Sequence, residues 1–320
     1  MSPRSSATRV TALAGGVGGA RLAHGLYKVL GPDELTVIGN TADDFNHFGL
    51  HVSPDLDTVM YTLAGEANPE TGWGVRGDTF ACMETLKRYG EPDWFRLGDR
   101  DLATNLLRTR MLGEGHRLTE VTRHLCKALG VRAALIPMSD EQVASWIMTR
   151  AGERLAFQEY FVKRHHQDPV RSVELEGIAD ARPPAEAREA LGAADVIVLC
   201  PSNPFVSIGP ILAVPGMREA LRAAPARKIA VCPTVGGQAL RGPAADMLAS
   251  MGHEPGAVGI ARMYRGIVDV LVIDPADASL SEAVRAEGVE PLIIPSVMHG
   301  EAERVQLATA VLDHAMGVRS

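Results

Sequence analysis

Short apolar runs alternate with segments of helical period along most of the chain. The runs occupy residues 10–14, 35–38, 133–136, 196–200, 228–232, 268–273 and 292–294. Strands that alternate with helices are typical of a mainly parallel sheet covered by helices on both faces. We therefore predict a doubly wound, Rossmann-like α/β fold.

Two regions break this alternation. Helical patterns follow one another over residues 54–130, which predicts a mostly helical insertion; Ser53 is placed to cap its first helix, with Pro54 in the first turn. Residues 144–162 alternate in polarity around Gly152, which predicts an antiparallel hairpin. No linker or repeat divides the sequence, so we expect a single α/β domain over residues 1–320.

Composition limits the possible partners. The 320 residues are 46% hydrophobic and 22% charged, as in ordinary globular proteins, and the net charge of −7 with no basic run argues against nucleic-acid binding. The N-terminus has no signal-peptide core, and no apolar stretch approaches the roughly 20 residues of a membrane helix. We expect a cytoplasmic protein with no membrane partner.

Buried free thiols are expected at Cys82, Cys126, Cys200 and Cys232, which lack the close pairing of metal or redox sites.

A glycine-rich loop follows the first apolar run, in VTALAGGVGGARLAHGL at residues 10–26. Such a loop lets the backbone approach a ligand, and the helix that follows directs free N–H groups toward it, so phosphate is the natural guest. The Gly-Lys-Ser/Thr ending of the P-loop is missing. The dinucleotide fingerprint fits only in part, because Arg21 stands at its third glycine position. An NAD-dependent oxidoreductase therefore remains an alternative.

Small polar loops follow the next strands as well, reading GNTADD, PMSD, PSNPFVSIGP and PTVGGQALRGP. Ligands of open parallel sheets bind beyond the carboxyl ends of the strands. Loops of this kind present backbone donors and short polar side chains along one edge. They predict a site for one extended ligand.

An acidic segment follows the second strand and contains no lysine or arginine. Its aspartates are Asp43, Asp44, Asp55 and Asp57. Such a cluster needs a cation, and beside a phosphate site Mg²⁺ is the natural one. The alternative is structural: Asp55 and Asp57 would favour a helix dipole, and Asp44 would cap a turn. The histidines of the segment are expected as polar loop residues, because their spacing is irregular for a transition-metal site.

Several stretches together resemble one family. They read GGVGGARLAHGL, NTADDFNHFGLHVSPDLDTVMYTLAG, GWGVRGDTF, WFRLGDRDLATNLLRT, PMSDEQV, FQEYFV, PSNPFVSIGPIL and GGQALRGPAADM, in the family's order and over nearly the whole chain. They are similar to the 2-phospho-L-lactate transferases that build the deazaflavin coenzyme F420.

The resemblance implies a magnesium-dependent reaction and a homodimer. The terminal ribityl hydroxyl of the deazaflavin Fo would attack the phosphate that carries the hydroxy-acid group of a guanosine-diphospho donor, and GMP would leave. No covalent enzyme intermediate is expected. Positioning and charge neutralisation would carry such chemistry.

The matching motifs also imply roles for individual residues. Asp43 would be the leading Mg²⁺ ligand with support from Asp44, and Asp43 and Asp57 would be the catalytic carboxylates. Asp57 and Arg96 would hold Fo. The predicted nucleotide and phosphate contacts are Gly16, Gly18, Gly19, Ser202 and Asn203. Trp73 and Trp94 would either stack on the deazaflavin or pack in the core.

The sequence departs from the family pattern at two loops. The first loop has Val17 where many members have threonine, and Cys232 replaces a common serine. The acid group of the donor therefore stays open among lactate, enolpyruvate and glycerate. A second alternative is a regulatory protein of the same fold that binds nucleotide sugars. Its acidic loop runs Asp-Asp-Gly-Gly-Ser-Ser-Gly, whereas Phe45-Asn46-His47 follows Asp44 here, which favours the transferase.

Overall fold

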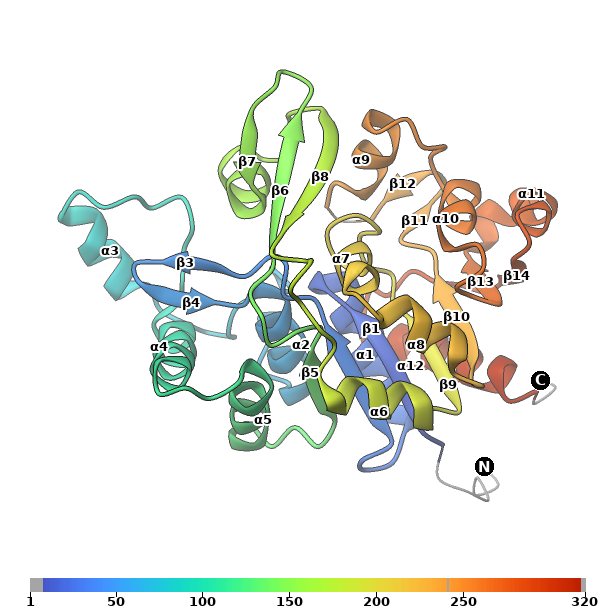
Figure 1. The fold of residues 1–320 in the computed structure, drawn as a ribbon, viewed down its shortest axis with the longest axis horizontal. Coiled ribbons are helices and arrows are strands. Elements are labelled where there is room, and N and C mark those ends of the chain that lie inside the picture. Colours follow the sequence, from blue (N-terminus) through green and yellow to red (C-terminus); the bar gives the residue numbers. More distant parts are fainter. Residues whose placement is uncertain (1–7, 241, 318–320) are drawn as a thin grey trace.

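The computed structural model describes residues 8–240 and 242–317. Its centre is a seven-stranded sheet in the order β14-β13-β10-β9-β1-β2-β5, and all neighbouring strands are parallel (Figure 1). The strands are β1 (Val10–Ala14), β2 (Leu35–Gly39), β5 (Ala134–Pro137), β9 (Val196–Leu199), β10 (Arg227–Val231), β13 (Val270–Ile273) and β14 (Glu290–Ile293). Each lies on one of the predicted apolar runs. The predicted doubly wound α/β fold is confirmed.

Helices cover both faces of the sheet. One face packs on α1 (Gly16–Val29), α2 (Pro54–Ala64), α5 (Leu118–Ala128) and α12 (Glu301–Ala315). The other packs on α6 (Ala185–Ala193), α7 (Ile208–Ala213), α8 (Met217–Ala223), α10 (Ala257–Tyr264) and α11 (Ser281–Ala286). Neighbouring β1 residues divide between the two cores, Ala12 in the first and Leu13 in the second. Burial on both faces explains why the strands are continuous apolar runs.

A smaller segment projects from the sheet between α2 and α5. It consists of α3 (Ala81–Arg88) and α4 (Asp99–Gly113), and it packs beside an antiparallel hairpin of β3 (Phe45–His47) and β4 (Leu50–Val52) (Figure 1). This hairpin was not predicted from the sequence, because its strands have three residues each and mix polar with apolar side chains. Since α2 and α5 pack on the central sheet, only the middle of the helical stretch projects.

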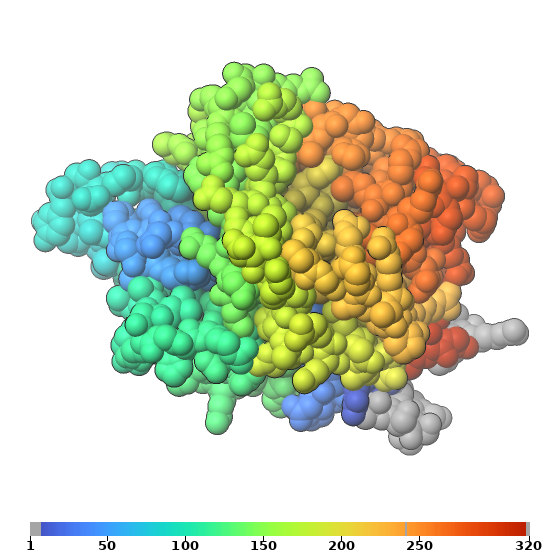
Figure 2. All heavy atoms as spheres, viewed as in Figure 1, coloured from blue at the N-terminus to red at the C-terminus, as the bar shows by residue number. Residues whose placement is uncertain are grey.

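The predicted hairpin after residue 144 is confirmed as β6 (Ala144–Thr149) and β7 (Arg154–Ala156). A third strand that was not predicted, β8 (Val170–Glu176), pairs with the other edge of β6. The remaining elements are a π-helix (Glu159–Lys163), β11 (Thr234–Val235), β12 (Gln238–Ala239), α9 (Ala244–Ser250) and a 3₁₀ helix (Pro275–Leu280). In Figure 2 the green β6–β8 sheet forms a ridge between the cyan projecting segment and the orange C-terminal helices.

Two local expectations are wrong. Cys82 is exposed on α3, while Cys126, Cys200 and Cys232 are buried free thiols as predicted. Ser53 precedes α2 but makes no capping hydrogen bond to it, because its hydroxyl donates to Asp44 instead. Within the described ranges, no helix is long and apolar enough to cross a membrane.

A buried histidine on α1 makes the stability of the protein depend on pH. Burial, with Arg304 and Lys28 nearby, lowers the pKa of His24 from its usual 6.5 to about 4, against the opposing effect of Glu301. The neutral imidazole therefore adds stability that is complete above pH 6.5 and is lost as the pH falls toward 4. In urea unfolding, the free energy of the wild type should fall more steeply over this range than that of His24→Leu. Equal slopes would contradict the assignment.

Candidate active site

The ends of β1, β2 and β9 meet at one edge of the sheet, and Asn40 and Asp55 tie their loops together. The Asn40 side-chain amide donates to Asp55 Oδ2 at 2.9 Å and to the Val206 carbonyl at 3.0 Å. Asp55 Oδ1 accepts the Gly16 N–H at 2.8 Å. Burial raises the pKa of Asp55 to about 6, although its hydrogen bonds with Asn40 and Gly16 oppose the rise. Asp55 therefore lies on α2 but accepts a hydrogen bond from the N-terminus of a different helix, α1.

The glycines of the first loop allow α1 to approach the loop after β9. Gly16 has φ +61°, and its N–H is already bonded to Asp55. A Cβ on Gly18 would lie 2.4 Å from the Pro201 carbonyl oxygen, and one on Gly19 would lie 2.4 Å from Ser202 Oγ. Close packing thus requires these glycines, whether or not they also contact phosphate.

Gly18→Ala should destabilise the protein by about 2 kcal/mol, because the added methyl group must displace backbone rather than a flexible side chain. The matched control is Gly192→Ala near the end of α6, where nothing lies within 4 Å of the new methyl group. Its free energy of unfolding should be unchanged or slightly higher. Urea denaturation of both variants measures the difference. A Gly18→Ala protein as stable as the wild type would contradict the packing.

Ser202 and Asn203 hold their own loop. Ser202 is buried; Oγ accepts the Gly15 N–H at 3.1 Å, and its hydroxyl lies 2.7 Å from the Gly15 carbonyl oxygen. Asn203 Oδ1 accepts the Phe205 N–H at 2.8 Å, which closes a turn. These bonds position the loop beside the glycines. A contact of either side chain with guanosine remains a prediction.

Three buried oxygens without partners lie just after β2. They are Thr41 Oγ1, Asp43 Oδ1 and Asp44 Oδ1, for which the described residues provide no hydrogen bond. Asp44 Oδ2, by contrast, accepts the Ser53 hydroxyl at 2.7 Å and lies 3.0 Å from His51 Nε2. Burial, and then the carboxylates of Asp55 and Asp44, raise the pKa of Asp43 well above its usual range. Buried polar atoms are rarely left unpaired, so these oxygens indicate a ligand.

The chemistry of these oxygens fits a hard cation. Across the described residues, no group of three or more His, Cys, Asp or Glu side chains is arranged to hold a metal ion by itself. Mg²⁺ does not need such a group, since it binds one or two carboxylates and completes its shell with substrate phosphate and water. Asp43 and Asp44 offer two free carboxylate oxygens near the N-terminus of α1. A Mg²⁺ ion shared with a phosphate therefore suits this edge.

Asp57 forms a buried ion pair with Arg108 of α4. The side chains are 8% and 2% exposed. This arginine supplies the counter-charge that the acidic segment itself lacks, from 51 residues further along the chain. Asp57 thus lies in the acidic cluster, but the interaction that the structure shows for it is with protein. Its contact with Fo remains a prediction.

The remaining predicted contacts lie in the projecting segment. Arg96 is exposed, and its guanidinium stacks over the Phe80 ring at 4.3 Å. Trp73 is 49% exposed, so it is not a core residue. Trp94 packs edge-on against His47, with 5.9 Å between the ring centroids. The hydrogen bonds and ion pairs of the described residues do not join Arg96 to the carboxylates.

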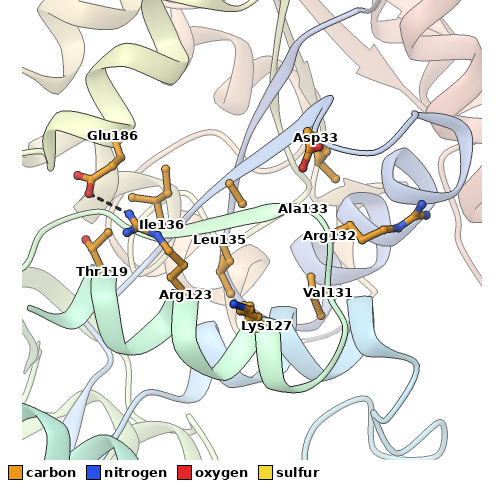
Figure 3. Close-up of a pocket in the computed structure, with 13 residues that line it drawn as sticks. Asp33, Thr119, Arg123, Lys127, Val131, Arg132, Ala133, Leu135, Ile136 and Glu186 are labelled. Atoms are coloured by element: carbon orange, nitrogen blue, oxygen red, sulfur yellow. Dashed lines mark hydrogen bonds and ion pairs between the residues drawn. The ribbon is translucent and has the colours of Figure 1, made fainter.

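A separate cavity of about 320 Å³ lies between α5 and the edge strand β5. Figure 3 shows Arg123 on its wall reaching Glu186, at 3.0 Å. None of the predicted site residues lines it. The cavity is therefore distinct from the carboxyl edge of the sheet.

Comparison with known proteins assigns the chain to a family. The family described as 2-phospho-L-lactate transferase CofD matches residues 10–311. The chain belongs to the CofD family. Members of this family, and the curated relatives described below, show that the chain is an enzyme. It transfers a phosphorylated hydroxy-acid group in the biosynthesis of coenzyme F420. The resemblance read from the sequence is confirmed.

Curated relatives share the whole length of the chain. A phosphoenolpyruvate transferase of Streptomyces griseus is 44% identical over 317 residues, covering 98% of this chain and 100% of the relative. One of Mycobacterium avium is 40% identical over 332 residues, covering 96% and 98%. A solved UPF0052-family protein of Bacillus halodurans has a TM-score of 0.66 at 21% identity, covering 97% of this chain and 100% of the other. That likeness supports the fold alone.

Sequence reasoning missed several residues of this edge. Asn40 stands directly after β2, where polar residues of parallel sheets meet ligands, so its position was an available signal. Asp55 was considered as a member of the acidic cluster and for the dipole of its own helix, but not as the partner of Gly16 at the start of α1. Arg108 gave no local signal, because it resembles any arginine of an amphipathic helix.

Proposed function

We propose that the protein transfers an enolpyruvyl-phosphate group from a guanosine-diphospho donor to the terminal ribityl hydroxyl of Fo, with release of GMP. The observation that carries the proposal is a pair of buried carboxylate oxygens, Asp43 Oδ1 and Asp44 Oδ1, that have no partner among the described residues and belong to the same cluster as Asp55, which binds the N-terminus of α1. That arrangement suits a cation and a diphosphate together. The names of the relatives at 44% identity favour enolpyruvate over lactate and glycerate as the acid group.

The chain's own residues would bind and orient the donor. The N-terminus of α1 would direct its positive dipole toward the diphosphate, while Asp55 and Asn40 fix that terminus against the neighbouring loops. Asp43 and Asp44 would hold Mg²⁺, which when bound neutralises charge on the phosphates. Ser202 and Asn203 would place the loop that faces the guanosine.

The reaction itself is a direct displacement. The Fo hydroxyl oxygen forms a bond to the phosphorus that carries the acid group, and the bond from that phosphorus to the bridging oxygen of GMP breaks. The hydroxyl proton leaves to solvent, and GMP departs with the bridging oxygen. Such a transfer depends on alignment and charge neutralisation, which the rigid edge of the sheet supplies.

The deciding experiment offers the protein Fo, Mg²⁺ and the enolpyruvyl, lactyl or glyceryl form of the guanosine-diphospho donor. Mass spectrometry should detect GMP and a phosphodiester-linked deazaflavin in equal amounts, with the highest kcat/KM for the enolpyruvyl donor. Preference for another donor would correct the acid group. A nucleotide-sugar-binding protein would release no GMP, and an oxidoreductase would instead bind NAD saturably.

A further inference from the structure

We propose that Arg108 is a positioning residue for the transfer reaction, which acts through Asp57 and the backbone of His51 to set the acidic pair. The inference rests on the proposed site, because its effect is exerted on Asp44. Arg108 lies on α4, which packs against β4 (Figure 1). It is among the largest fully buried side chains of the described residues.

The buried guanidinium of Arg108 depends on a small number of protein contacts. Its guanidinium pairs with Asp57, and Nη1 donates to Asn105 Oδ1 at 2.6 Å, while Nε has no partner among the described residues. A buried guanidinium is costly unless it is paired. The Asp57 carboxylate is therefore the main compensation for this charge, and the pair ties the first turn of α2 to α4.

Two residues of α4 also form hydrogen bonds with the backbone of His51 in β4. Arg108 Nη1 donates to the His51 carbonyl at 3.4 Å, and the next residue, Thr109, accepts the His51 N–H on Oγ1 at 2.7 Å. Arg108 and Thr109 thus bind the backbone carbonyl and the backbone N–H of His51, respectively. The backbone position of His51 is accordingly set by α4 rather than by the short hairpin alone.

The side chain of His51 in turn contacts Asp44, one of the two acidic residues. Its Nε2 lies 3.0 Å from Asp44 Oδ2, the same oxygen that accepts the Ser53 hydroxyl at 2.7 Å. Oδ2 of Asp44 therefore has two partners, while Oδ1 has none in the described part of the chain. Partners of this kind around a metal-binding carboxylate usually matter about 10–100-fold for metal affinity or activity. The contacts form a continuous path from Arg108 to the oxygen that would meet the cation.

The test compares Arg108→Met, Arg108→Lys, Asp57→Asn and the double variant Asp57→Asn/Arg108→Met. Arg110→Met is the matched control, since Arg110 lies on the same helix with its side chain 67% exposed. For each protein, the melting temperature, Mn²⁺ affinity by calorimetry, kcat and KM are measured. Arg108→Met should lower the melting temperature by roughly 10 °C, because Asp57 is left buried without its partner. It should also weaken Mn²⁺ binding and lower kcat, each by about 10-fold or more.

The double variant separates positioning from simple stability. It removes both charges, so its melting temperature should return toward that of the wild type. Its Mn²⁺ affinity should stay low, because Arg108 no longer holds the His51 carbonyl; kcat does not separate the two roles, since Asp57 is itself predicted to contact Fo. Arg108→Lys should fold and bind Mn²⁺ more tightly than Arg108→Met.

Recovery of Mn²⁺ affinity together with the melting temperature would overturn the proposal and leave Arg108 a structural residue. Because Mn²⁺ binding is measured without substrate, it tests Arg108 even if the wild type does not turn over the chosen donor. Failure of wild-type turnover would count against the proposed reaction alone. Arg110→Met should match the wild type in every measurement.

Discussion

Asp43→Asn is expected to lower kcat by about 1000-fold or more while the protein stays folded and becomes no less stable. Asp43 Oδ1 is buried and has no partner among residues 8–240 and 242–317, and the neighbouring Asp55 and Asp44 carboxylates repel its charge. Asparagine has nearly the same shape, so the change removes charge without leaving a cavity. The loss in rate follows because that charge would hold the cation that neutralises the transferred phosphate.

The measurements for Asp43→Asn are GMP release and urea denaturation. Asp33→Asn is the matched control, since Asp33 is exposed, and its φ of 63° suits asparagine as well as aspartate. The control should keep wild-type kcat. An Asp43→Asn protein with wild-type turnover would remove Asp43 from the site, whereas one that unfolds would show that its role is structural.

Removal of divalent cations is expected to abolish turnover and to lower the melting temperature of the wild type. Without a cation, the buried Asp43 and Asp44 carboxylates repel one another, and Oδ1 of each has no partner among the described residues. Mg²⁺ at about 100 times its dissociation constant should stabilise the folded state by about 2.7 kcal/mol. Scanning calorimetry with EDTA, and then with excess Mg²⁺, measures the shift.

Asp43→Asn also serves as the control for this second prediction. Its melting temperature should change little between EDTA and Mg²⁺, because the leading ligand is gone. Turnover that persists in EDTA would contradict the assignment of Mg²⁺ to this edge. A Mg²⁺ shift of equal size in both proteins would place the ion elsewhere.

The predicted strands were found because their signal is local. Each parallel strand buries both faces, so it appears in the sequence as an unbroken apolar run bounded by polar loops. The β3–β4 hairpin lacks that signal, since its strands have three residues each and carry polar side chains. It is stabilised mainly by α4, whose packing partner cannot be read from either segment alone.

The sequence by itself determined the seven parallel strands, the glycine loop and the position of Asp43 and Asp44 at the carboxyl edge of the sheet. These depend on periodicity and on the rule that parallel strands end together. Only the tertiary structure decided which groups neutralise and orient the carboxylates. Asp55 meets Gly16 across 39 residues, and Ser202 meets Gly15 across 187. Such pairs form because folding brings remote segments within hydrogen-bond distance, and no local pattern encodes which partners will meet.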